Sequence, residues 1–410
     1  RPPGAVSPSA MPSSRRSTLP YVLLAVFVPV ALVLGLWLGG HPSSLPGPLR
    51  DVFVDKSIRT VDEAFSTIQD DYYRSIPREK LADQAVRGAI AGLNDRFSGY
   101  FNPEEYRRFQ ESTAGQFSGV GLSVEGEAKG LKVTRVVPNA PAAQAGMRAG
   151  DTIVAVDGQP LAGKSVQAST ALIKGQPGTF VRVTYQRGAK RTTVRLQRRQ
   201  IDVPAVQSSL KTFRGKKIGV DALSGFTSGA HGELREAIDR QLKAGAQGIV
   251  LDLRGNGGGL LDEAVLVSSI FLRDGTVVST DGRSRDRQVY KATGGAIRGS
   301  IPVVVLVDGS SASASEIVTA ALQDRGRAKV VGTRTFGKGV FQEIEALGNG
   351  GALDITVGEY FTPNGRNLGG GGVKRGSGVK PDVTAADNPS TATDEALQQA
   401  LKTLVSQPQE

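Results

Sequence analysis

The spacing of hydrophobic residues changes along the chain, and each change predicts a different kind of structure. Residues 21–38 are apolar apart from Pro29 and Gly35, a stretch long enough for a membrane-spanning helix. From residue 51 to about residue 112, apolar side chains recur every three or four positions. This second pattern predicts two or three helices.

Two further regions, residues 115–200 and the residues from 201 onward, have different patterns of apolar residues. Residues 115–200 contain short strand patterns broken by Gly and Pro, with one helical pattern at residues 165–175. From residue 201 onward, strand and helix patterns alternate, and continuous apolar strands such as residues 303–307 indicate a sheet covered on both faces. We therefore expect a β-rich domain followed by an α/β core.

These patterns predict a multidomain α/β protein. Its expected parts are a leader with a transmembrane anchor or signal segment (1–50), a helical region (51–114), the β-rich domain (115–200), the α/β core (201–386) and a C-terminal tail with one helix (387–410).

The N-terminal segment also predicts an orientation. Arg15 and Arg16 precede the apolar stretch, so the positive-inside rule places the N-terminus in the cytoplasm and the later domains outside it. The small residues Gly39 and Gly40 leave a cleaved signal peptide as the alternative. We expect the uncleaved anchor.

The amino-acid composition excludes several kinds of catalytic and metal-binding chemistry. The chain has no cysteine and only His41 and His231 as histidines, which excludes disulfides, thiolate nucleophiles and cysteine-bound zinc. The net charge of 50 − 39 = +11 is spread along the chain. Because interleaved aromatics and a basic recognition helix are missing, we expect no nucleic-acid partner, and we expect no metal or other cofactor.

The first candidate loop, residues 251–259 (LDLRGNGGG), follows a predicted strand. It fails the dinucleotide fingerprint because Leu260 stands where the last glycine is needed. A tight turn explains Gly255 and Gly259, yet three consecutive glycines before a helix also direct bare amides toward a negative charge. The loop therefore suits an oxyanion hole.

The second loop, residues 310–316 (SSASASE), opens a predicted helix and has two interpretations. Ser313 and Glu316 form the S-x-x-E pattern of a helix capping box. A turn from strand to helix also exposes a nucleophile, with the next amide, that of Ala314, facing the developing oxyanion. The residues alone favour neither the helix cap nor the nucleophile.

The third loop, residues 332–342 (GTRTFGKGVFQ), nearly spells a phosphate-binding loop. Gly339 replaces the required Ser or Thr, and a strand pattern follows, so we reject that interpretation. Lys338 lies among apolar residues, and burial would lower the pKa of its amine toward that of a general base. A histidine base would have to be His231, so a serine–lysine dyad is favoured.

These three motifs, in this order after a PDZ-like domain, resemble the carboxyl-terminal processing proteases, a family of tail-specific serine–lysine endopeptidases. Segments outside the loops, NDRFSGYFNPEEYRRF and YFTPNGR, extend the resemblance over nearly all of the chain beyond the apolar segment. It implies a PDZ domain at 115–200 and an α/β serine protease core at 201–386.

The resemblance also assigns roles to residues. Ser313 matches the nucleophile, Lys338 the general base and Gln342 the residue that orients the lysine. The oxyanion hole would be formed by the amides of Gly258 and Ala314. In the PDZ-like domain, Val120, Gly121 and Leu122 match the loop that binds the carboxylate of a substrate's C-terminus.

The expected partners are protein and peptide substrates with free C-termini, and the membrane through the N-terminal helix. The sequence leaves a homo-oligomer open. The competing function is a membrane-tethered PDZ adaptor with an inactive protease domain, but the presence of all three of Ser313, Lys338 and Gln342 argues against it.

Overall fold

The computed structural model describes residues 27–30, 55–388 and 390–407. Most of the apolar segment at residues 21–38 lies outside these ranges, so the predicted membrane helix remains a prediction. Within the ranges that are described, no helix is both long and apolar enough to cross a membrane. The chain divides into two compact units, residues 1–89 and 90–410, which we describe separately.

The helical spacing predicted near the N-terminus is confirmed. The first unit contains α3 (Lys56–Asp71) and most of α4 (Arg78–Ala91), and α5 (Pro103–Thr113) belongs to the second. Local chemistry sets the helix starts: the Asp55 carboxylate accepts from the amide of Ser57 at 2.8 Å ahead of α3. Asn102 and Glu105 form a capping box at the start of α5.

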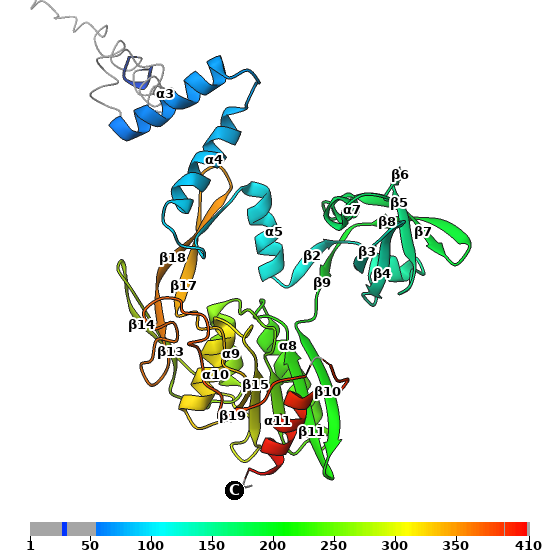
Figure 1. Ribbon diagram of the computed structural model, residues 1–410, viewed down its shortest axis with the longest axis vertical. Helices are drawn as coiled ribbons and strands as arrows, with labels where there is room; N and C mark the ends of the chain where they lie inside the picture. The colour runs from blue at the N-terminus through cyan, green and yellow to red at the C-terminus, as the bar shows by residue number, and fades with distance from the viewer. Residues whose placement is uncertain (1–26, 31–54, 389, 408–410) are drawn as a thin grey trace, which may run out of the picture. The chain divides into compact units, whose positions relative to one another are not determined.

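The β-rich domain is a sheet with strand order β3-β4-β5-β7-β8, and β6 pairs with β5 (Figure 1). Its elements are β3 (Leu122–Glu127), β4 (Gly130–Val136), α6 (Pro141–Gln144), β5 (Thr152–Val156), β6 (Gln159–Pro160), α7 (Val166–Ile173), β7 (Phe180–Arg187) and β8 (Lys190–Gln197). Leu131, Val133 and Ile153 belong to its hydrophobic core. β2 (Gln116–Gly119) precedes this sheet in the chain and β9 (Arg199–Asp202) follows it, and these two strands pair with each other as a separate ribbon.

The α/β core contains a second sheet, with order β10-β11-β12-β15-β16-β19 (Figure 1). Its strands are β10 (Val206–Phe213), β11 (Lys216–Leu223), β12 (Ile249–Asp252), β15 (Val303–Val307), β16 (Lys329–Gly332) and β19 (Val383–Thr384). The helices are α8 (Ala230–Lys243), α9 (Leu261–Ser269), α10 (Ala314–Asp324) and α11 (Glu395–Val405). All strands from β11 to β19 in this order are parallel, and β10 is antiparallel to β11.

Strand β15 shows why the core strands are continuously apolar. Its residues Val303, Val305 and Val307 pack into the cluster that includes α8, α9 and α10, whereas Val304 and Leu306 pack into the cluster that includes α11. Because successive side chains point to opposite faces, both faces must be apolar. The helix predicted in the C-terminal tail is therefore part of the core, buried through Ala400 and Leu404.

A third sheet, with order β1-β18-β13-β14 and β17 paired to β18, brings an early segment to the core. Its strands are β1 (Gly99–Phe101), β13 (Thr276–Gly282), β14 (Arg285–Lys291), β17 (Val340–Ala346) and β18 (Ala352–Phe361). The sequence patterns predicted β17 and β18 but not β1 or the β13–β14 hairpin. The pairing of β1 with β18 places residues 95–101 beside the strands that follow Lys338.

Candidate active site

The three candidate loops meet at one edge of the core sheet. They follow β12, β15 and β16, which are neighbouring parallel strands, so their carboxyl ends lie side by side. Ser313 directly precedes α10 with φ 56° and ψ −116°, a conformation that non-glycine residues rarely adopt. Such strain at a strand-to-helix turn is typical of an exposed nucleophile.

The neighbouring serines are used differently from Ser313. The buried hydroxyl of Ser311 donates to the carbonyl of Leu253 at 2.8 Å, and that of Ser315 donates to the carbonyl of Asn256 at 2.9 Å. Both bonds join the loop at residues 310–316, here called the nucleophile loop, to the loop at residues 251–259, here called the glycine loop. Ser313 differs, because among the described residues its half-buried hydroxyl donates no hydrogen bond and accepts only within the capping box that it forms with Glu316, so its proton is available to a base.

Glu316 is the main residue that the sequence analysis undervalued. Its fully buried carboxylate accepts from the amide of Ser313 at 3.1 Å, as a capping box requires. It also accepts from the amides of Gly337 at 2.8 Å and Lys338 at 2.9 Å, and from the hydroxyl of Thr335 at 2.6 Å. Burial raises the pKa of Glu316, and these four donors oppose that rise. The carboxylate thus joins the nucleophile loop to the loop at residues 332–342, here called the lysine loop.

Lys338 is half-buried, and its ammonium donates to Gln342 Oε1 at 2.6 Å. Gln342 in turn donates from Nε2 to the hydroxyl of Thr356 at 2.9 Å. Burial lowers the pKa of Lys338, and the nearby carboxylates of Asp354, Asp95 and Glu316 oppose this shift. No hydrogen bond joins Ser313 Oγ to Lys338 Nζ in the part of the chain that the structure describes.

The glycine loop lies against the nucleophile. A Cβ atom at Gly258 would come within 2.8 Å of Ser313 Cβ and 3.0 Å of the Ala314 nitrogen, so only glycine fits there. Within the described ranges the Ala314 amide has no hydrogen-bond acceptor. The Gly258 amide donates to Asn256 Oδ1 at 2.9 Å, so an oxyanion would have to share or replace that bond.

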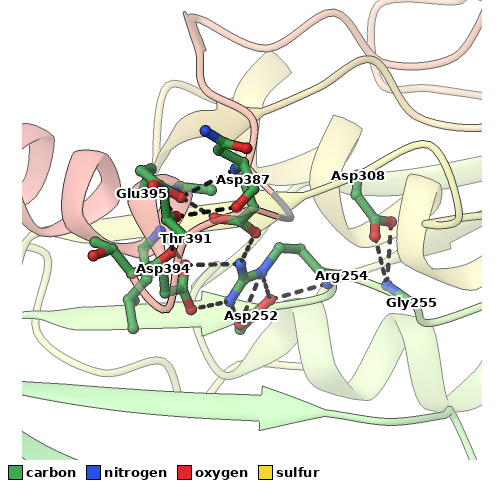
Figure 2. A network of polar contacts seen from close by, with 12 residues as sticks. Asp252, Arg254, Gly255, Asp308, Asp387, Thr391, Asp394 and Glu395 are labelled. Atoms are coloured by element: carbon green, nitrogen blue, oxygen red, sulfur yellow. Dashed lines mark hydrogen bonds and ion pairs between the residues drawn. The ribbon is translucent and has the colours of Figure 1, made fainter.

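Ionic contacts hold the glycine loop in place (Figure 2). The guanidinium of Arg254 binds Asp252 at 2.7 Å, Asp387 at 2.8 Å and Asp394 at 2.9 Å, and Asp394 is the cap of α11. The carboxylate of Asp308 accepts from the amide of Gly255 at 3.1 Å, which ties the first loop to the second. Sequence analysis gave no signal for either contact.

The predicted tail-binding residues belong to the β-rich domain. β3 is an edge strand of its sheet, and the residues before it, Val120 and Gly121, are buried. Gly121 has φ +81°, and a Cβ there would lie 2.1 Å from Ala140 Cβ, so glycine is required. Helix α7 faces the same strand, since a Cβ on Gly126 would lie 2.8 Å from Val166 Cγ2.

No metal site competes with this arrangement among the residues that the structure describes: no group of three or more His, Asp or Glu side chains could hold an ion. His231, the alternative base, binds the buried Glu263 through Nδ1 at 2.9 Å. The structure therefore brings Ser313, Lys338 and Gln342 into one network through Glu316, without a role for His231.

Comparison with known proteins identifies both domains. Residues 217–385 match the family model described as peptidase family S41, and residues 118–197 match the PDZ domain. Residues 217–385 are therefore an S41 peptidase domain and residues 118–197 a PDZ domain, which confirms the resemblance found from the motifs.

Curated relatives are similar over most of this chain. A probable CtpA-like serine protease of Staphylococcus haemolyticus is 34% identical over 334 residues, which is 81% of this chain and 65% of the relative. A probable CtpA-like serine protease of Staphylococcus aureus strain COL is 34% identical over 330 residues, 80% of this chain and 64% of the relative. The chain thus spans somewhat less than two thirds of their length.

Solved structures are also similar. The photosystem II D1 C-terminal processing protease has 29% identity and a TM-score of 0.49, over 86% of this chain and 98% of that one. A structure from Bacteroides fragilis whose name refers to an S41 protease has 17% identity and a TM-score of 0.50, over 82% of this chain and 91% of that one. The second likeness supports the fold alone.

Proposed function

We propose that the chain is a serine endopeptidase that uses a Ser/Lys dyad and selects protein substrates by their C-terminal tails. The observation that carries the proposal is the double role of Glu316, whose carboxylate anchors the backbone of both Ser313 and Lys338. Two loops held by one buried carboxylate suit a reaction in which the two side chains act together.

In this mechanism the neutral amine of Lys338 accepts the hydroxyl proton of Ser313 while Ser313 Oγ forms a bond to the scissile carbonyl carbon. The Ala314 amide, joined by that of Gly258, stabilises the resulting oxyanion. The C–N bond then breaks, and the lysine ammonium protonates the leaving amine. Water hydrolyses the acyl-enzyme through the same two residues. Gln342 orients the amine throughout.

The direct test is cleavage of an unfolded reporter with an apolar C-terminal tail. The wild-type chain should cleave it, and Ser313→Ala should not. Ser310→Ala is the matched control, because Ser310 is an exposed serine in the same loop. If the wild type is inactive, or if Ser313→Ala retains full activity, the dyad assignment is wrong and the PDZ adaptor becomes the better function.

Tail recognition is proposed for the PDZ domain. The free edge of β3 suits an added peptide strand, and the loop at Val120 to Leu122 offers backbone amides to a terminal carboxylate. Two reporters that differ only in a free or amidated C-terminus test this role. Amidation removes charge-assisted hydrogen bonds worth roughly 1.5–3 kcal/mol, so we expect at least ten-fold slower cleavage at subsaturating substrate. Equal rates would exclude carboxylate recognition.

The location of the enzyme is also a proposal. The apolar segment at residues 21–38 behind Arg15 and Arg16 supports a membrane anchor with the catalytic part outside the cytoplasm. Fractionation of cells that express the full chain tests the anchor, and protease added from outside tests the orientation. A released form that starts near His41 would indicate signal-peptide cleavage instead. Light scattering of the purified protein tests the homo-oligomer.

A further inference from the structure

A pocket of about 280 Å³ lies between helix α5 and the α/β core. Its large apolar side chains are those of Tyr106 and Phe109 from α5, Leu260 from the end of the glycine loop, and Ile344 from β17. Among the described residues that line the pocket, none is charged. An ion would be costly to bury there without a partner, whereas an apolar side chain would gain by leaving water.

Strand β17 places the pocket beside the residue that orients the candidate base. Gln342 and Ile344 are two positions apart in the regularly paired part of β17, so their side chains point to the same face of the sheet. Two positions along a strand span about 7 Å. Gln342 accepts from the amine of Lys338 at 2.6 Å on this face. The pocket therefore begins one side chain beyond the contact between Gln342 and Lys338.

Leu260 connects the pocket to the proposed oxyanion hole. It follows Gly258 by two positions, so their Cα atoms are at most about 7 Å apart. Phe226 fixes this spacing, because its amide donates to the Gly258 carbonyl at 3.0 Å and its carbonyl accepts from the Leu260 amide at 2.9 Å. Neighbouring residues of an extended peptide are about 3.3 Å apart. A substrate whose scissile carbonyl lies at the Gly258 amide thus has a side chain within reach of the pocket.

Helix α5 is fastened over the sheet at two points, so its wall of the pocket is fixed. Phe109 stacks on Phe101 of β1, with ring centroids 5.0 Å apart. β1 in turn pairs with β18. At the C-terminal end of the helix, the carbonyl of Thr113 accepts from the amide of Ser228 at 3.0 Å. The pocket is therefore formed before any substrate arrives.

We propose that this pocket, here called the α5 pocket, binds an apolar side chain of the substrate within two residues of the scissile bond, and that Ile344 and Phe109 set its size. The inference rests on the proposed protease function and adds a second selection to that of the C-terminal tail. A cavity of about 150 Å³ can hold a benzene ring. The larger volume of the α5 pocket leaves room for the side chain of leucine or phenylalanine.

A packing gap without an occupant is the alternative, and Ile355 provides the matched control. It is a half-buried isoleucine of β18 that pairs with Glu343, the neighbour of Ile344 in β17. Its side chain therefore points to the opposite face of the sheet. Substitutions at the two isoleucines should disturb the packing of the sheet in similar ways, but only those at Ile344 should change which substrate is cleaved.

The experiment measures kcat/KM for reporters with a mapped cleavage site, in which each of the two positions on either side of the scissile bond is in turn alanine, leucine or phenylalanine. At one of these positions we expect the wild type to favour leucine or phenylalanine over alanine by about ten-fold or more. Ile344→Phe fills the pocket and should remove this preference, with the alanine reporter changed less than about three-fold. Ile344→Ala enlarges the pocket and should favour phenylalanine further. Ile355→Phe and Ile355→Ala should keep the wild-type preference.

The outcomes separate the two levels of the argument. An inactive wild type overturns the proposed function and this inference with it. An active wild type with no apolar preference at these positions overturns the inference alone, as does a preference that Ile344→Phe leaves intact or that Ile355→Phe removes equally. Thermal transitions show whether each variant is folded. If the Ile344 variants are not, Phe109→Leu enlarges the pocket from the opposite wall, and an unchanged preference there would overturn the inference.

Discussion

Glu316 Oε2 accepts a hydrogen bond from the backbone amide of Lys338 at 2.9 Å, although the two residues are 22 positions apart. The same oxygen accepts from the amide of Ser313, whose positive φ needs such an anchor. The relationship makes the spacing of the two loops depend on one buried carboxylate.

Glu316→Gln tests this dependence. The amide group would replace one acceptor oxygen by a donor that faces two other donors, so buried N–H or O–H groups would lose their partners. We expect a loss of about 2 kcal/mol or more in the free energy of unfolding, together with a drop in kcat. Urea unfolding and reporter kinetics measure both effects. Glu236→Gln, on the exposed surface of α8, is the control and should change neither.

The pH dependence of cleavage tests Lys338. Burial lowers the pKa of this amine, and only the neutral amine can accept the proton of Ser313. Activity should therefore rise with pH through that lowered pKa and then level off. Lys338→Arg should be inactive at every pH in this range, because a guanidinium does not lose its proton. A variant with arginine that still cleaves the reporter would remove Lys338 from the mechanism.

Arg254→Lys tests the ionic contacts of the glycine loop. The guanidinium bridges Asp252, Asp387 and Asp394, and a single ammonium cannot reproduce this forked contact. We expect a decrease of roughly 1–3 kcal/mol in unfolding free energy. Turnover should also decrease, because Gly258 follows in the same loop. Arg240→Lys, in an exposed pair on α8, serves as the reference and should have little effect.

The buried carboxyl group of Asp221 should make the free energy of unfolding depend on pH. Burial raises its pKa from 3.8 to about 6, and one of its oxygens is buried without a hydrogen bond among the described residues. The folded state therefore holds this proton more tightly than the unfolded state does. Its contribution to stability is fully present below about pH 4 and is lost as pH rises through about 6, at a cost of the order of 3 kcal/mol.

Asp221→Asn cannot ionise, so its stability relative to wild type should increase between about pH 4 and pH 7. Chemical unfolding at several pH values measures the difference. The exposed Asp286→Asn variant should follow the wild-type curve. Parallel curves for Asp221→Asn and wild type would contradict the prediction.

Gly121→Ala tests the tail-binding loop. The new Cβ would meet Ala140 Cβ at 2.1 Å in a backbone conformation with φ +81°. Gly163→Ala is a matched control, since Gly163 has φ +77° in the same domain but open space around its Cα. We expect Gly121→Ala alone to abolish the preference for a free C-terminus over an amide. Equal effects of the two substitutions would mean that the loop shape does not matter.

Several features of this protein follow from the sequence by itself. The continuous apolar run of β15 predicts a strand buried on both faces, because alternate side chains must enter opposite apolar layers. Glycine clusters and helix starts then place three loops after successive strands. Their motifs were enough to predict the family and to single out Ser313 and Lys338, since a local pattern carries its own signal.

Only the tertiary structure decided how those loops are joined. The capping-box pattern of Ser313 and Glu316 looks the same whether or not the carboxylate also binds Lys338, so the sequence could not reveal this contact. The placement of Asp95 depends on the pairing of β1 with β18, which joins distant segments and leaves no periodic trace. Hydrogen bonds between remote residues depend on the folded backbone, whereas periodicity reports only which side chains share a face.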